Sequence, residues 1–243
     1  MAEEKLILIL ANSIRERNRC VAGKELIPSR NGYKAGEWIR LADPRTEGAI
    51  KAETATCAGH GSVRPLDLVK VPVREQCSDL DHPEDWWIEP AKNWEYVRSY
   101  DPDILQRLED KEPDLWSEGR TTDAVSFGYV RRMPKPSTLI LMRAPPIMQV
   151  SFWKETGHDW NSPGQIKEKK HRRLWMKYEG RTHEFSVTDP EFNSRHDLFN
   201  RMTTKPQELE LANRTEIYLC LSLTPQFNDW HYKICATVFE PNA

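Results

Sequence analysis

Residues 36–41 combine an aromatic and a cationic side chain at a spacing that could bind nucleic acid. Period-two alternation predicts a strand with Trp38 and Arg40 on one face and Ile39 and Leu41 on the other. A tryptophan can stack on a base, which contributes about 1–3 kcal/mol per base, while a nearby arginine binds the backbone phosphate. The alternative is that Trp38 covers the mouth of a barrel and Arg40 lies in solvent or pairs with an acidic residue.

The densest basic run of the chain spans residues 167–173, and Trp175 lies just beyond it. Basic residues with an interleaved aromatic suit single-stranded nucleic acid. The alternatives are a solvated face, or a strand edge where positive charge deters aggregation. The binding candidates in and beside this run are Lys169, Lys170, Arg172, Arg173 and Trp175.

Two loops add further candidates. Arg17 and Arg19 belong to an arginine-rich stretch after the first predicted strand, and such a stretch could bend over a barrel and bind phosphates. A second loop, at residues 225–230, leads into Trp230, Tyr232 and Lys233, which could contact a nucleic acid or a nucleotide. For the arginine-rich stretch, a solvated loop is the alternative.

No catalytic signature is present. The chain lacks GxSxG, GxGxxG, HExxH and a Walker phosphate loop, and the glycine-rich stretch at residues 58–62 lacks the lysine that such a loop uses. Carboxylates at Glu84 and Asp85 could serve as general acid and base or as magnesium ligands, but charged loops of this kind are usually only solvated. We therefore expect no catalytic residue, no cofactor and no metal, and a metal-dependent nuclease is the third reading.

Composition limits the class of protein. Charged residues make up 30% of the chain and hydrophobic residues 38%, which describes a globular protein rather than a disordered or membrane-embedded one. The apolar run at residues 6–11 is too short for a membrane span or a signal peptide, so we expect a cytoplasmic protein without membrane contact. The five cysteines include no CxxC pair and form no disulfide framework. The net charge of −2 leaves room only for a local basic groove.

The first half of the chain reads as short strands separated by polar loops. Strands are predicted at residues 5–11, 19–23, 37–41 and 67–73. Asp101 before Pro102 is typical of a helix start, and a helix is expected from there to about Asp110. The basic, proline-punctuated stretch at residues 131–136 resembles a linker, and we place the domain boundary there.

The second half of the chain shows a similar pattern of short strands and turns. Strands are expected at residues 138–143 and 148–153, a hairpin around Glu179 and Gly180, a helix from Asp189-Pro190 to about Thr203, and a terminal hairpin at residues 217–239. This succession is close to that of a small Greek-key barrel. The predicted fold is mainly β, with two tandem OB-like small barrels and short connecting helices. The predicted divisions are residues 1–100, a connector at 101–136, and residues 137–243.

Several short motifs resemble, in order, the prokaryotic dual-OB-domain family. They are Leu-Ile-Leu-Ile-Leu-Ala-Asn-Ser at 6–13, Arg-Cys-Val-Ala-Gly at 19–23, Gly-Glu-Trp-Ile-Arg at 36–40, His-Pro-Glu-Asp-Trp at 82–86, Ser-Leu-Thr-Pro-Gln-Phe at 222–227 and His-Tyr-Lys-Ile-Cys-Ala at 231–236. The resemblance implies two OB-type barrels, a nucleic-acid or nucleotide-binding role, and a setting in bacterial defence or mobile elements. The segments 96–119 and 167–173 depart from the pattern.

These observations support two hypotheses of different class. In the leading one, the protein is a non-catalytic module that binds single-stranded nucleic acid or a nucleotide through the candidates named above. In the alternative, it is a scaffold that docks a protein effector through the aromatic and acidic segment at residues 101–119. Nucleic acid and an effector protein are therefore the two expected partners.

Overall fold

The structure is a computed structural model of the chain. The structure describes residues 2–15, 18–30, 32–46, 48–77, 82–111, 114–118, 122–133, 137–158, 166–211 and 216–240. Within these residues, no helix combines the length and the apolar character that crossing a bilayer requires.

The first half is a closed five-stranded barrel. Its strands run in the order β1-β2-β3-β7-β6, and β1 also pairs with β6, which closes the sheet. The pairing of β3 with β7 is parallel and the others are antiparallel. The bounds are β1 Glu3–Arg15, β2 Asn18–Ser29, β3 Gly32–Ala42, β6 Asp67–Gln76 and β7 Asp85–Ile88, with β8 (Glu95–Ser99) outside β6 and a small pair of β4 (Thr56–Cys57) and β5 (Gly61–Ser62).

Both faces of β1 are buried, which explains its continuous apolar run. Ile7 and Ile9 belong to the core cluster inside the barrel, whereas Leu8 and Leu10 belong to a second cluster on the other face. Close contact between β1 and β2 depends on Gly23, because a Cβ atom there would lie 2.0 Å from the carbonyl oxygen of Leu8. The barrel therefore has an apolar interior and a second apolar face on its outside, formed by the cluster that includes Leu8 and Leu10.

The second half repeats the order of the first. The strands follow β10-β15-β16-β13-β12-β11-β14, so β11-β12-β13-β16-β15 matches β1-β2-β3-β7-β6, and β13 pairs with β16 in parallel as β3 does with β7. The bounds are β9 Ala124–Ser126, which pairs with β16, β10 Leu139–Arg143, β11 Met148–His158, β12 Ile166–Tyr178, β13 Arg181–Val187, β14 Gln207–Leu209, β15 Tyr218–Leu223 and β16 Trp230–Phe239. The predicted mainly β fold is confirmed.

The helices are shorter than predicted. The expected helix from Pro102 is a 3-10 turn, η1 (Pro102–Ile104), followed by α1 (Leu105–Leu108). The expected helix after Asp189 is divided into α3 (Pro190–Arg195) and α4 (Leu198–Arg201), because Asp197 between them has a left-handed backbone with φ of 50°. The predicted cap is present, since Asp189 Oδ1 accepts hydrogen bonds from the backbone of Glu191 and Phe192. A further helix, α2 (Phe127–Arg132), precedes β10.

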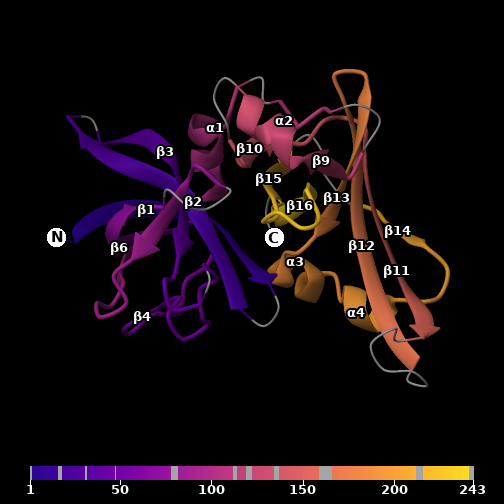
Figure 1. Ribbon diagram of the computed structural model, residues 1–243, viewed down its shortest axis with the longest axis horizontal. Helices are drawn as coiled ribbons and strands as arrows, with labels where there is room; N and C mark the ends of the chain where they lie inside the picture. The colour runs from indigo at the N-terminus through magenta and orange to yellow at the C-terminus, as the bar shows by residue number, and fades with distance from the viewer. Residues whose placement is uncertain are drawn as a thin grey trace.

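The two halves pack side by side, with β15 and β16 lying between the first barrel and the long β11–β12 hairpin (Figure 1). The second cluster contains side chains of both halves: Leu8, Leu10, Leu26 and Leu68 meet Leu139, Leu141, Tyr218, Cys220 and Phe239. Asp110 adds polar links across this contact. It accepts hydrogen bonds from Lys24 Nζ at 2.5 Å, Trp38 Nε1 at 3.0 Å and the Leu141 amide at 2.8 Å.

Candidate nucleic-acid interface

The outer face of β12 presents an alternating row of cations and an aromatic. Leu174 and Met176 point into the core of the second half, so the residues between and before them point outward. The β11–β12 register places Trp153 opposite His171, and their rings stack with centroids 4.7 Å apart and an interplanar angle of 8°. The outward row of β12 consists of Lys167, Lys169, His171, Arg173, Trp175 and Lys177.

Some of these charges are paired and some are not. Arg173 Nε lies 3.3 Å from Glu184, and His171 Nε2 lies 3.1 Å from Glu155. Lys167, Lys169 and Lys177 are exposed, and none of them forms an ion pair with a residue that the structure describes. The face therefore keeps unpaired positive charge beside two half-buried tryptophans, Trp153 and Trp175.

The basic run does not act as one patch, because neighbouring strand residues face opposite ways. Lys170 and Arg172 lie on the other side of β12. There, Lys170 Nζ and Arg172 Cζ lie 4.9 and 5.0 Å from the centre of the Phe199 ring in α4. Burial lowers the pKa of Arg172. Of the predicted cations in this run, Lys169 and Arg173 share the outer face with Trp175, and Lys170 and Arg172 do not.

Trp38 and Arg40 are buried where the two halves meet. Their predicted alternation is correct, but the face they share is covered by the second half, so Trp38 is 8% exposed and Arg40 is 5% exposed. Trp38 donates to Asp110, and Arg40 NH2 donates to Thr138 Oγ1 at 3.1 Å and Ser222 Oγ at 3.0 Å. Both side chains contact the other half, so the open stacking surface expected on this strand is covered. Nucleic-acid binding by Trp38 and Arg40 stays a prediction.

The predicted group on β16 is likewise divided by strand alternation. Trp230 and Tyr232 are 38% and 40% exposed, whereas Lys233 is 1% exposed and its Nζ lies 3.4 Å from His183 Nδ1. Burial lowers the pKa of Lys233 to about 8 and that of His183 to about 4. Lys233 therefore faces the core of the second half, and its assignment to a nucleic-acid surface is corrected.

The segment proposed for effector docking also contributes to the core. Leu105 and Leu108 pack in the cluster shared by the halves, and Leu115 and Trp116 pack in the core of the second half. Trp116 is fully buried and its Nε1 donates to the Ser137 carbonyl oxygen at 2.8 Å. These apolar side chains stabilise the fold, so a partner would have to recognise the polar side chains of this segment.

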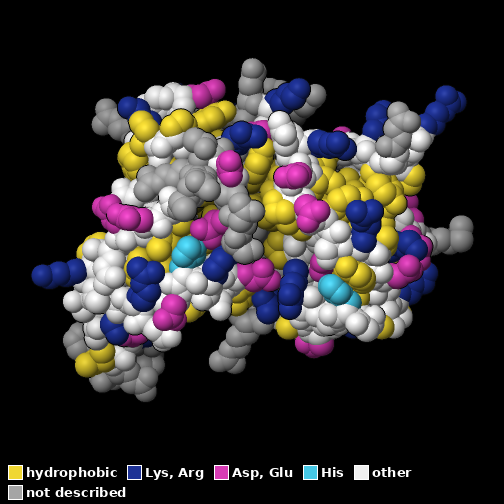
Figure 2. Space-filling model, turned by 180° about the vertical axis from the view of Figure 1, so that it is seen from behind, with side chains coloured by type: hydrophobic (Ala, Val, Ile, Leu, Met, Phe, Trp, Pro, Cys, Tyr) yellow, Lys and Arg dark blue, Asp and Glu magenta, His cyan; other side chains and the backbone are white. Residues whose placement is uncertain are grey.

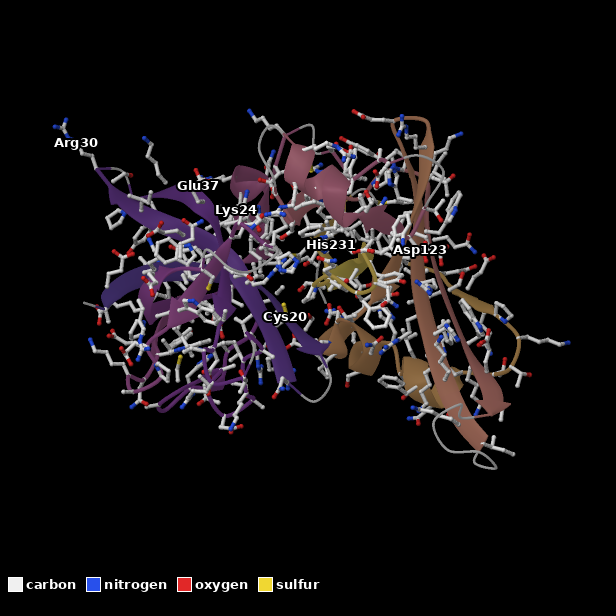
Figure 3. All side chains as sticks on the ribbon, viewed as in Figure 1. Cys20, Lys24, Arg30, Glu37, Asp123 and His231 are labelled. Atoms are coloured by element: carbon white, nitrogen blue, oxygen red, sulfur yellow. The ribbon has the colours of Figure 1, made fainter. Side chains whose placement is uncertain are left out.

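A cleft of about 430 Å³ lies between the two halves, and sequence reasoning did not identify it. Its residues come from the ends of β1, β2 and β3, from the segment before β7, and from the β15–β16 loop, so no local motif could reveal them. Figure 3 shows Cys20 between the two halves, Arg30 at the far end of the β2–β3 hairpin and Glu37 part way along it. Of the predicted residues, Arg19, Arg40 and Tyr232 line the cleft, and Arg17 lies outside the described residues.

The β15–β16 loop is held in place at the mouth of this cleft. Asn228 and Asp229 both have positive φ, as a tight hairpin turn requires, and the backbones of Phe227 and Trp230 pair across it. The Thr224 carbonyl oxygen accepts hydrogen bonds from His82 Nε2 at 3.1 Å and His231 Nδ1 at 2.7 Å. These contacts fix the backbone that carries Phe227 and Tyr232 at the cleft.

The floor of the cleft is a buried cluster of charged and polar groups. Arg40 NH1 lies 3.6 Å from Asp85 Oδ1, and His82 Nδ1 lies 3.6 Å from Asp85 Oδ2. Burial lowers the pKa of His82 and the charge of Arg40 lowers it further, so His82 is neutral at pH 7. Burial alone disfavours the charge of Arg40, but Asp85 and other nearby groups outweigh this effect and raise its pKa.

Charge is mixed on the face of the molecule shown in Figure 2. On this face (Figure 2), Lys and Arg side chains alternate with Asp and Glu side chains rather than gathering in one area. Among the described residues, no group of three or more His, Cys, Asp or Glu is arranged to hold a metal ion. The interaction features are therefore local: the outer face of β12 and the cleft between the halves.

Two units with the same five-strand order, one carrying an aromatic and cationic outer face, define a mainly β protein of the tandem-barrel class. The chain matches the model of the dual OB-containing domain over residues 5–238, and it belongs to that family. This confirms the predicted family. A search of curated proteins found no match.

Proposed function

We propose that the protein binds single-stranded nucleic acid, without catalysis, on the outer face of β11, β12 and β13. The observation that carries this proposal is the outward row of β12, in which Lys167, Lys169, His171, Arg173, Trp175 and Lys177 follow one another beside Trp153, which stacks on His171. In this arrangement the lysines bind backbone phosphates and the tryptophans stack on bases. Stacking tolerates any base, so the expected sequence preference is weak.

The position of this row within the fold supports the proposal. By strand order, β12 and β13 are the second and third strands of an OB unit. The face of these two strands is where OB folds commonly bind oligonucleotides. The corresponding strands of the first half, β2 and β3, have much of that surface covered by the second half. We therefore place one binding face on the protein, on its second half.

The proposal is tested by fluorescence anisotropy with labelled single-stranded DNA and RNA at low and physiological salt. Trp175→Ala should weaken binding about 5- to 150-fold, which corresponds to the loss of about 1–3 kcal/mol of stacking. Tyr33→Ala is the matched control, since Tyr33 is an exposed aromatic on the β2–β3 hairpin of the other half. Absence of saturable binding at low salt, or equal losses in the two variants, would refute the proposal.

The lysines are tested by the salt dependence of binding. Each phosphate contact contributes about −0.7 to the slope of log K against log salt for a single strand. The double variant Lys167→Ala/Lys169→Ala should therefore make the slope shallower by about 1.4, whereas Lys34→Ala, an exposed lysine on β3, should leave it unchanged. An unchanged slope in the double variant would remove these lysines from the interface.

The proposal also includes an accessory role in a bacterial defence or mobile-element system, as the family resemblance implies. It is tested by challenging cells that carry or lack the gene with phage. Docking of an effector through residues 101–119 is a prediction from the sequence, and the burial of Leu105, Leu108, Leu115 and Trp116 gives it no support.

A further inference from the structure

We infer that the cleft between the two halves binds a nucleobase, with its polar edge on Arg40 and Asp85 and its ring against Phe227 and Tyr232. The base is that of a free nucleotide or of one nucleotide in a bound strand. The strand source rests on the proposed function, and the free-nucleotide source does not. Both sources share the chemistry of a flat heteroaromatic ring with hydrogen-bonding groups along its edge.

The size and walls of the cleft suit such a ligand. A volume of about 430 Å³ falls within the range of about 300–1,000 Å³ that small-ligand sites occupy. Phe227 is 64% exposed although the backbone of its hairpin turn is fixed, and Tyr232 lies beside it at the same cleft. An exposed aromatic pair at the mouth of a largely apolar cleft with a charged floor can stack on a planar ring.

The floor of the cleft offers donors beside an acceptor. Arg40 Nε and NH1 and Asp85 Oδ1 are buried and form no hydrogen bond with a described residue, although NH1 and Oδ1 face each other as an ion pair at 3.6 Å. Leaving buried polar atoms unpaired is costly, about 1–3 kcal/mol for each group. A nucleobase edge carries an acceptor next to a donor, as adenine does with N7 and the N6 amino group. Such an edge could satisfy Arg40 and Asp85 together.

The charges of the floor disfavour a phosphate there. Arg40 faces Asp85 directly, and Glu84 is a second carboxylate that acts on it, so one cation is opposed by two anions. His82, which is neutral at pH 7, adds no positive charge. Arg19 also lines the cleft and is half-buried, outside this floor cluster. The arrangement therefore favours a base on the floor and its phosphate near Arg19.

Cys20 provides a direct readout of occupancy. All five cysteines lie within the described residues, and Cys20 lines the cleft as the one that is not buried. Alkylation by N-ethylmaleimide, followed by intact-protein mass, should therefore modify Cys20 first. Saturating nucleoside or nucleoside 5′-monophosphate should slow this modification at least fivefold. Ribose 5-phosphate and inorganic phosphate should not slow it.

Titration calorimetry with the same ligands gives a second readout that does not depend on the thiol. Phe227→Ala and Tyr232→Ala should each weaken nucleotide binding about tenfold, and Tyr33→Ala should not. Both side chains are exposed, so these variants should keep the fold. If inorganic phosphate protected Cys20 as well as nucleotides do, the cleft would be an anion site and the inference of a base site would be wrong. Absence of protection and of heat with every nucleotide and oligonucleotide would overturn the inference.

The experiment separates this inference from the proposed function. Protection of Cys20 by free nucleosides supports a base-binding site in the cleft even if no oligonucleotide binds. Absence of oligonucleotide binding would then contradict only the proposed function. Protection by an oligonucleotide alone, lost in Tyr232→Ala, supports a base supplied by a strand. Oligonucleotide binding that depends on Trp175, with Cys20 protected neither by the oligonucleotide nor by free nucleosides, would overturn the cleft site and leave the proposed function intact.

Discussion

The side chain of Lys233 is buried in the core of the second half, and this position affects the stability of the protein. Its Nζ contacts His183 Nδ1, and burial lowers the pKa of Lys233 from 10.5 to about 8. A lowered pKa means that the folded state binds the proton less tightly than the unfolded state. The free energy of unfolding therefore increases as the pH rises from about 8 to about 10.5, and at pH 7 the protein lacks this increase.

We expect Lys233→Met to be more stable than the unsubstituted protein at pH 7, by up to about 3 kcal/mol, because methionine fills similar space without a charge. The difference should shrink towards zero as the pH approaches 10.5. Urea unfolding of both proteins at pH 7, 8.5 and 10 measures this difference. A difference that does not change with pH would show that Lys233 has an ordinary pKa in the folded protein.

Single residues show where prediction from sequence ends. Alternation correctly places Trp38 and Arg40 on one face of β3, because strand geometry alone determines it. Whether that face meets water or the second half depends on residues about a hundred positions away, such as Thr138 and Leu139. The same limit hid the cleft, whose floor joins Arg40 to Asp85 and whose mouth comes from the β15–β16 loop.

At the scale of elements, the strands were the most predictable feature. Period-two patterns located most of the main strands, but not their lengths: β11 and β12 continue as an exposed, charged hairpin well beyond the apolar residues that mark them. The predicted helices were too long, because in each case a local backbone change ends the first helical turns, as the left-handed Asp197 does between α3 and α4. Polar strand extensions and local backbone interruptions leave little trace in the hydrophobic pattern, so the sequence did not indicate them.

The contact between β1 and β2 gives a sharp test of the first barrel. Gly23→Ala would place a methyl group 2.0 Å from the Leu8 carbonyl oxygen, so the strands would have to separate. We expect a loss of at least about 2 kcal/mol in the free energy of unfolding. Gly157→Ala in β11 is the matched control, because nothing lies within 4 Å of its added Cβ.

Thermal and urea unfolding of the two glycine variants measure these losses. Gly157→Ala should change the free energy of unfolding by less than about 0.5 kcal/mol, as substitutions away from packed features usually do. Equal stability of Gly23→Ala and the unsubstituted protein would mean that the close approach of β1 and β2 is not needed for the barrel.

At the scale of the whole molecule, the shared cluster makes each half depend on the other. Separate fragments of residues 1–111 and 112–243 would expose the side chains that meet there, including Leu8 and Leu10 in one and Leu141 and Phe239 in the other. We expect both fragments to bind the dye ANS and to self-associate on size exclusion, because large exposed apolar patches drive association. The intact chain is the control, and two monomeric fragments without dye binding would contradict the expectation.

The position of β16 has a consequence for how the protein is made. This strand pairs with β15, β13 and β9, yet it is synthesised after all of them. At about 5–20 residues per second, ribosomes need on the order of ten seconds to extend the chain from α1 to the end of β16. Throughout that interval the nascent first barrel has an uncovered apolar face. Nascent chains of this protein should therefore recruit holdase chaperones, and slow codons between α1 and β16 should lower its yield.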